Sequence, residues 1–133
     1  MGPFDQDPQG FRNLLTIRNL VSTFSIIYPL KSRLDAPASV LDVITHLTAQ
    51  LETSLKVLQT DNAREFTTAL AKLGIGFYPS LPYFPQENGK AECLNQTLGD
   101  MARAMLTESG MLSQFWQFSY ASVCYLHNHL LNQ

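Results

Sequence analysis

The stretch LKVLQTDNAREF, residues 55 to 66, places an acidic residue directly after an apolar run. Residues 55–60 are the kind of short apolar run that is typical of a buried strand, and Asp61 follows at its end. Ligands gather at the carboxyl ends of strands in open α/β sheets, so an aspartate there can hold a metal ion. Asp followed by Asn is also common in plain turns. The local sequence leaves both interpretations open.

Two strands and a helix are predicted before this stretch. Residues 13–19 and 23–30 are rich in β-branched and aromatic residues, which predicts an antiparallel hairpin. Asp35 and Pro37 are start signals for a helix over residues 37–53. The apolar stripe at helical spacing in this helix consists of Val40, Ile44, Leu47 and Leu51.

The rest of the chain is predicted to be mostly helical. The remaining predicted elements are a helix at 67–74 ending at Gly74, a strand at 75–79, a loop at 80–89, a helix from near Asn88 to 108–110, and a helix beginning at Ser113. The stripes of the last two helices are Leu94, Leu98, Met101 and Met105, and Phe115, Trp116, Tyr120 and Val123. This order of elements predicts an α/β fold, with a mixed sheet flanked by helices in one domain over residues 1–133.

The composition indicates a soluble globular protein, with 45% apolar and 15% charged residues in a chain of 133. No apolar run is long enough to span a membrane, and the first ten residues lack the layout of a signal peptide. We therefore expect an intracellular protein, and no basic localisation run in the sequence decides whether it is nuclear or cytoplasmic. Cys93 and Cys124 form no CxxC pair, so the sequence predicts neither a zinc site nor a disulfide framework.

The charge balance bears on nucleic-acid binding. The chain has 9 Lys and Arg residues against 11 Asp and Glu residues, for a formal net charge of −2. Domains that bind DNA usually carry a basic surface. Any such function here must therefore depend on a local patch.

Glu92 lies on the helix predicted to begin near Asn88. At 100° per residue it falls about 140° from the centre of the apolar stripe, on the side turned away from the core. The residues that share this outward side are Gln96, Gly99 and Arg103. Asp61 and Glu92 can therefore meet in one cleft, where paired carboxylates bind Mg²⁺ or Mn²⁺. The plainer interpretation of Glu92 is a favourable charge in the first turn of a helix.

Three segments resemble a known family. They are TDNAREF at 60–66, PYFPQENGKAECLNQTLGDMARAML at 82–106 and FWQFSYASVCYLHN at 115–128. Together with GPF at 2–4, they resemble the integrase catalytic core of copia-type LTR retrotransposons, a retroviral-type integrase of the ribonuclease H-like superfamily. The resemblance implies a ribonuclease H-like mixed sheet. It also implies a metal-dependent reaction that trims element DNA ends and joins them to target DNA.

The resemblance implies roles for individual residues. Asp61 and Glu92 match the second and third of three catalytic carboxylates that hold two Mg²⁺ or Mn²⁺ ions, and residues 85–89 match a mobile loop beside the site. The residues that would contact nucleic acid are Arg64, Asn88, Gly89, Lys90, Gln96 and Arg103. The expected partners are element-end and target DNA, bound weakly at best, and a second copy in a homodimer. No membrane and no small-molecule cofactor are expected.

The chain departs from the family at the first carboxylate. In relatives this residue lies on the opening strand, a few residues before the match to Gly2 and Pro3. The chain given starts at Met1, so it lacks that position and most of that strand. Asp5 and Asp7 follow the match to Gly2 and Pro3 and sit beside Pro8, so they are predicted to be loop residues. Metal ligands need a fixed geometry, so neither is expected to replace the missing carboxylate. We therefore expect a catalytically impaired integrase core.

Further departures concern the DNA-binding side. Cys93 stands where relatives usually have Arg, and Gln96 stands at a position that is commonly basic. Asp61 and Glu92 are also about one helical turn closer in sequence than in relatives. Fewer cations should weaken DNA binding and flatten its salt dependence.

Three hypotheses follow. The chain is an impaired remnant of an integrase core, or an active polynucleotidyl transferase whose first Asp lies upstream, or a non-catalytic nucleic-acid-binding or dimerising module of the same fold. The aromatic residues of the last helix predict core packing or a subunit interface rather than base stacking; they are Phe115, Trp116, Phe118 and Tyr120. His127 and His129 are two residues apart on a helix and cannot pair on a metal.

Overall fold

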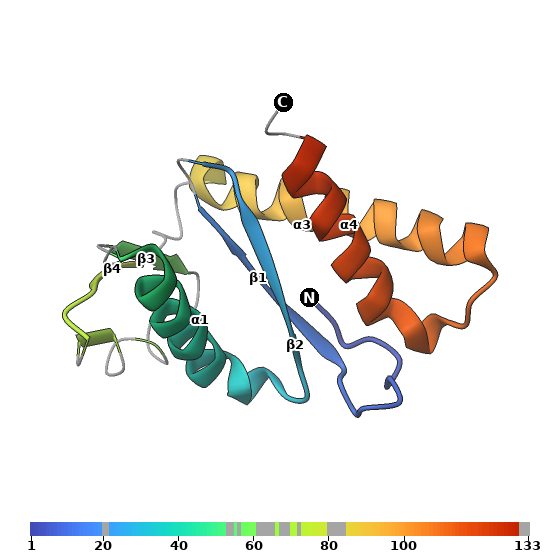
Figure 1. The fold of residues 1–133 in the computed structure, drawn as a ribbon, viewed down its shortest axis with the longest axis horizontal. Helices are drawn as coiled ribbons and strands as arrows, with labels where there is room; N and C mark the ends of the chain where they lie inside the picture. Colours follow the sequence, from blue (N-terminus) through green and yellow to red (C-terminus); the bar gives the residue numbers. More distant parts are fainter. Residues whose placement is uncertain are drawn as a thin grey trace. The chain divides into compact units, whose positions relative to one another are not determined.

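The computed structural model describes residues 1–19, 22–52, 55, 57–60, 66, 70–71, 73–79 and 85–130 (Figure 1). The chain divides into two compact units. One unit comprises Met1–Arg33 and Ala91–Gln133, and the other comprises Leu34–Lys90. None of the described helices is long and apolar enough to cross a membrane.

The first unit is built on a β-hairpin. Strand β1 (Asn13–Arg18) pairs antiparallel with strand β2 (Ser25–Leu30), which confirms the predicted hairpin. The start of the chain lies along the other edge of β1, because the Leu14 amide donates to the Met1 carbonyl at 2.9 Å. The hairpin thus gains a short third segment beside β1.

Two helices complete the first unit. They are α3 (Pro85–Ser109), whose first six residues belong to the second unit, and α4 (Trp116–Leu130), which follows a 3₁₀ turn, η2 (Ser113–Phe115). The core that they form with the hairpin consists of Leu14, Leu94, Leu98, Ala102, Trp116, Tyr120 and Val123. Phe4 stacks on Trp116 with ring centroids 4.5 Å apart. The predicted stripes of both helices therefore face the core, with Met101 and Met105 partly buried beside it. The exception is Phe115, which lies in η2, is only partly buried and is not part of the core.

Asn128 ties α4 to the start of β2. Its Oδ1 accepts from the Ser25 amide at 2.8 Å, and its Nδ2 donates to the Ser25 carbonyl at 2.7 Å. The Cys124 thiol donates to the same carbonyl at 3.3 Å. All three residues are buried. The Asn128 side chain thus satisfies the Ser25 backbone as a neighbouring strand would.

In the second unit, helix α1 (Ala36–Leu51) begins where the sequence predicts, with Asp35 at the N-cap. The stripe residues that are buried or partly buried are Val40, Ile44 and Leu47. The prediction that Leu51 belongs to the buried stripe is wrong, since this side chain is 63% exposed. Leu51 is the last helical residue, and Glu52 after it is left-handed with φ of 51°.

The second unit also contains a parallel strand pair, β3 (Val57–Thr60) and β4 (Gly76–Pro79). The predicted end of a helix at Gly74 is confirmed. The amides of Gly74 and Ile75 both donate to carbonyls one turn back at 3.2 Å, and Gly74 has φ of 67°. This is the Schellman arrangement, which favours glycine at the left-handed position. Half of the predicted helix at 67–74, residues 67–69 and 72, lies outside the described residues.

Two predicted boundaries are wrong. Helix α3 begins at Pro85, so residues 85–89, predicted as loop, form its first turn. Proline suits this position because the first helical amide has no partner within the helix. Ser113 does not cap α4; its hydroxyl donates to the carboxylate of Asp5.

The fold is mixed α/β. It has an antiparallel strand pair, a parallel strand pair and three longer helices among the described residues. Both pairings of a mixed sheet are present, as two separate two-stranded sheets. The single domain over 1–133 stays a prediction.

Candidate metal and nucleic-acid site

Glu92 lies on the exposed side of α3, as the sequence predicts. Leu94 and Leu98 on the same helix are buried in the core of the first unit, so the helix holds its outward side chains on a packed support. Within the described part of the chain, the Glu92 carboxylate has no hydrogen-bond or ion-pair partner. Such a carboxylate is an available hard-oxygen ligand for a divalent cation. Glu92 therefore fits the role of a metal ligand.

The structure leaves the second carboxylate undescribed. Strand β3 ends at Thr60, so the predicted strand end directly before Asp61 is confirmed. Asp61 and Arg64 themselves lie outside the described residues, and their roles stay predictions. Across the described ranges, no three His, Cys, Asp or Glu residues group closely enough to hold a metal ion.

Three of the predicted nucleic-acid contacts are at the start of α3. Asn88, Gly89 and Lys90 all lie in the helix, and Lys90 is exposed. Farther along, Gln96 is also exposed, and it carries no charge. Lys90 is thus an exposed cation in the first turns of α3, on a different side of the helix from Glu92.

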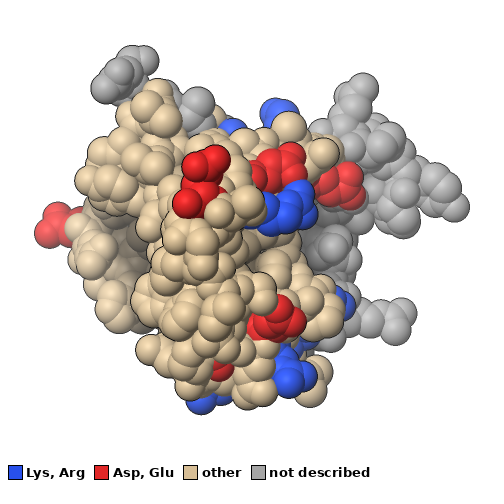
Figure 2. Space-filling view, turned by 90° about the vertical axis from the view of Figure 1, so that its right-hand side faces the viewer, with Lys and Arg blue, Asp and Glu red and all other residues tan. Residues whose placement is uncertain are grey.

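The predicted contact Arg103 is exposed but is paired within its own helix. Its guanidinium donates to the Asp100 carboxylate, one turn earlier, in an ion pair between two exposed side chains. The pair offsets the positive charge that Arg103 would present to DNA. On the face shown in Figure 2, acidic and basic residues are likewise interspersed among uncharged ones.

Gly99 is not on the outward side, contrary to the sequence prediction. It is buried, and a Cβ at this position would lie 3.3 Å from the Tyr120 hydroxyl oxygen. Tyr120 of α4 packs over the helix at this point, and burial raises the pKa of its hydroxyl. Gly99 therefore serves the close approach of α4 to α3.

Asp5 and Asp7 have structural partners, in agreement with the prediction that they are loop residues. Asp7 is buried, and its Oδ1 accepts from the amides of Gln9 at 2.9 Å and Phe11 at 2.7 Å. Asp5 accepts from the Ser113 hydroxyl through its carboxylate. Its backbone carbonyl accepts from the indole of Trp116 at 2.8 Å.

The sequence gives no signal for a contact that lies close to Glu92. The Thr16 hydroxyl of β1 donates to Asn95 Oδ1 of α3 at 2.6 Å. The two residues are 79 positions apart, and each looks like an ordinary strand or helix residue in its own segment. Only the packing of α3 on the hairpin brings them together.

The comparisons with known proteins agree with this fold. No family profile matches the chain. The chain is 34% identical over 90 residues to the retrovirus-related Pol polyprotein from transposon TNT 1-94 of Nicotiana tabacum, a match over 62% of this chain and 7% of the polyprotein.

Among solved structures, the chain is similar to one chain in the cryo-EM structure of the simian T-cell lymphotropic virus intasome in complex with PP2A regulatory subunit B56 gamma. The TM-score is 0.72 at 21% identity, over 96% of this chain and 46% of that chain. The likeness shows that the two chains share a fold. The resemblance found in the sequence is thereby confirmed: the chain is similar in sequence to part of a transposon Pol polyprotein, and it shares the fold of a chain in the intasome structure.

Proposed function

We propose that the chain is the core of a retrotransposon integrase with a ribonuclease H-like fold, and that it binds DNA along the exposed side of α3. The observation that carries this proposal is Glu92, a carboxylate without a described partner on a helix packed into the core. The similarity to a retrotransposon Pol polyprotein supports it.

Glu92 and Asp61 would hold Mg²⁺ or Mn²⁺ in this proposal. When bound, such an ion activates an attacking oxygen and stabilises the leaving oxygen in phosphoryl transfer. The contribution of the chain is to present the Glu92 carboxylate from a helix whose Leu94 and Leu98 are fixed in the core. Oxygen ligands on a packed support suit a cation that demands a regular geometry.

DNA binding would be weak because few cations are available. Lys90 is exposed, whereas Arg103 is paired with the Asp100 carboxylate and Gln96 carries no charge. The resemblance adds Arg64, so Lys90, Arg103 and Arg64 together would neutralise at most three phosphates. The slope of log affinity against log salt concentration would then be about −2 to −3 for duplex DNA.

We further propose that the 133-residue chain joins DNA strands poorly. Asp5 and Asp7 lie in the segment before β1, and both have structural hydrogen bonds. Metal binding by the Asp5 carboxylate would compete with its bond to Ser113, and metal binding by Asp7 Oδ1 would break its bonds to two backbone amides. Each broken bond to a charged group costs about 1.5–3 kcal/mol.

Two assays test the proposal on the wild-type chain and Glu92→Gln. Fluorescence anisotropy with labelled element-end duplex should show salt-sensitive binding in both proteins, since Glu92 is not a phosphate contact. A strand-transfer assay with Mn²⁺ should give no product above background. Robust product that Glu92→Gln abolishes would overturn the impairment. Binding that does not respond to salt would overturn the DNA-binding role.

The surface of α4 favours a second candidate, a dimerising module. Its residues, WQFSYASVCYLHNHL, include no acidic residue, Lys or Arg. Three large side chains on the helix are more than half exposed, namely Phe118 at 53%, Tyr125 at 62% and Leu130 at 65%. Depletion of charge and enrichment in aromatic residues are typical of interface cores.

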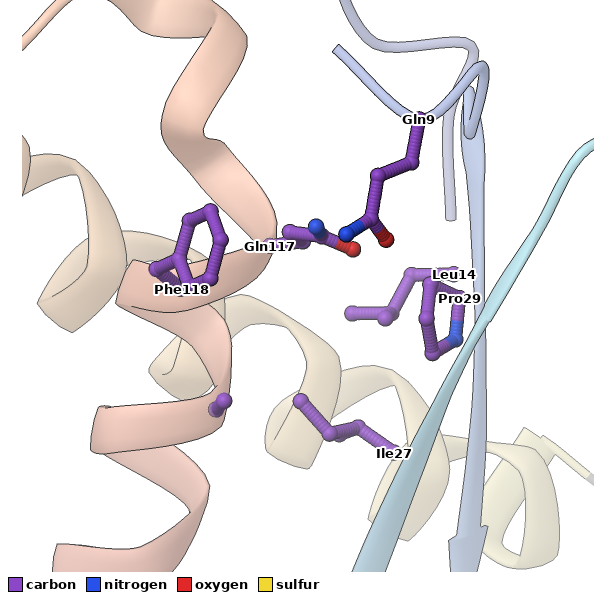
Figure 3. A pocket seen from close by; sticks show the side chains of 7 residues that line it. Gln9, Leu14, Ile27, Pro29, Gln117 and Phe118 are labelled. Carbon is purple, nitrogen blue, oxygen red and sulfur yellow. The ribbon is translucent and has the colours of Figure 1, made fainter. Parts of the chain in front are cut away.

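A cavity beside Phe118 adds to this apolar surface. It has a volume of about 270 Å³ and is lined in part by Phe118, and Figure 3 shows Gln117 of α4 reaching toward Leu14 and Pro29 of the hairpin. Sedimentation velocity should show a dimer that Phe118→Asp converts to monomer and Glu92→Gln leaves unchanged. A wild-type chain that remains monomeric at all concentrations would exclude this function.

A further inference from the structure

One side-chain hydrogen bond joins the hairpin to the part of α3 that carries Glu92. The Thr16 hydroxyl donates to Asn95 Oδ1 at 2.6 Å, and both side chains are partly buried. Asn95 lies three residues after Glu92, less than one helical turn away. The contact therefore acts on the same turn of helix that presents the carboxylate.

The position of Asn95 around the helix axis allows this contact to restrain the rotation of α3. At 100° per residue, Asn95 lies about 60° from Glu92, between that side chain and the apolar residues Leu94 and Leu98. The apolar residues hold α3 on the core, but hydrophobic contacts have no preferred direction. The hydrogen bond is directional. Thr16 is thus the directional restraint nearest to Glu92 on the rotation of α3 about its own axis; a second one lies farther along, where the Ser119 hydroxyl of α4 donates to the Ala102 carbonyl at 2.7 Å.

A small rotation would displace the carboxylate by a distance that matters. Side-chain atoms lie about 5–6 Å from a helix axis, so a turn of about 10° moves them by about 1 Å. Functional groups in a site have to be held within about 0.5 Å of their working positions. Losing the restraint at Asn95 would therefore be enough to loosen a metal ligand at Glu92.

We propose that Thr16, acting through Asn95, is a positioning residue for the Glu92 carboxylate and sets its affinity for a divalent cation. This inference rests on the proposed function, in which Glu92 binds Mg²⁺ or Mn²⁺. Neither residue needs to touch the ion. Partners of this kind, which orient a metal ligand without binding the metal, change metal affinity by about 10-fold to 100-fold when removed.

The test is a set of variants of the whole chain, with Mn²⁺ alone as the probe. Thr16→Val keeps the shape of the side chain but removes the hydroxyl, whereas Thr16→Ser keeps the hydroxyl. Thr107→Val is the matched control, because the Thr107 hydroxyl donates to the Arg103 carbonyl at 2.9 Å within α3 and does not reach the hairpin. Electron paramagnetic resonance of free Mn²⁺ gives the dissociation constant, and circular dichroism melts confirm that each variant is folded.

The expected result is a dissociation constant raised about tenfold in Thr16→Val and by less than about twofold in Thr16→Ser and Thr107→Val. Thr16→Val should have no additional effect in an Asn95→Ala background, because the hydrogen bond is already absent there. Wild-type affinity in folded Thr16→Val, or an equal effect of Thr16→Val in both backgrounds, would overturn the positioning role. Equal Mn²⁺ binding by wild type and Glu92→Gln would instead overturn the metal site itself.

Discussion

The bond pair between Asn128 and Ser25 gives a sharp stability prediction. Asn128 is 8% exposed and Ser25 is 1% exposed, so water cannot easily replace a lost partner. In Asn128→Ala the Ser25 amide loses its acceptor, 2.8 Å away, and the Ser25 carbonyl keeps only the Cys124 thiol. A buried unsatisfied amide costs about 1–3 kcal/mol, and the second hydrogen bond contributes about 0.5–1.5 kcal/mol. We expect the free energy of unfolding to fall by about 2–4 kcal/mol.

Urea denaturation followed by circular dichroism measures this loss. Ser122→Ala is the control, because Ser122 is exposed on the same helix and donates only to the Phe118 carbonyl, at 3.0 Å. Its expected cost is within about 0.5 kcal/mol. If Asn128→Ala lowers the free energy of unfolding by no more than Ser122→Ala does, the two hydrogen bonds do not stabilise the packing of α4 on β2. The predicted loss is a large part of the stability of a typical domain, about 5–15 kcal/mol.

Three further predictions concern pH and charge. Burial, and secondarily Arg18, lowers the pKa of His127 in the folded state. The unfolded chain therefore takes up this proton first as the pH falls, so the stability present above pH of about 6.5 is lost on acidification through the folded pKa. His127→Gln should reduce this loss in urea melts at successive pH values, and an unchanged profile would contradict the assignment. Gln96→Lys should steepen the slope of log affinity against log salt concentration by about 0.9, measured by fluorescence anisotropy. An unchanged slope would mean that residue 96 does not contact a DNA phosphate. Asp100→Asn should tighten DNA binding about twofold to fivefold by releasing Arg103, in line with the energy of an exposed ion pair, and equal affinity would show that the pair does not compete with DNA.

Features set by neighbouring residues were predictable from the sequence. The hairpin, the start of α1 at Asp35 and the end of a helix at Gly74 depend on interactions within a few positions, and all three are found in the structure. The buried positions of α4 also follow from spacing, because Trp116, Tyr120 and Val123 recur on one side of the helix.

Features set by tertiary packing were not predictable. Residues 85–89 contain loop-forming residues, yet α3 starts at Pro85, where proline is well tolerated. Gly99 was assigned to the outward side because spacing cannot show that Tyr120 would cover it. The hydrogen bond between Thr16 and Asn95 spans 79 positions, so no local pattern reports it. Within the candidate site, the outward position of Glu92 was predictable because it depends on helix periodicity alone.

The close approach of Tyr120 to Gly99 limits how the proposed DNA-binding surface of α3 can change. A side chain at residue 99 would begin 3.3 Å from the Tyr120 hydroxyl oxygen, so a basic residue there requires α4 to move. Residue 96 is exposed and carries no such restriction. A variant with higher affinity for DNA could therefore arise by a single substitution at residue 96. At residue 99 it would need a compensating change in α4 first.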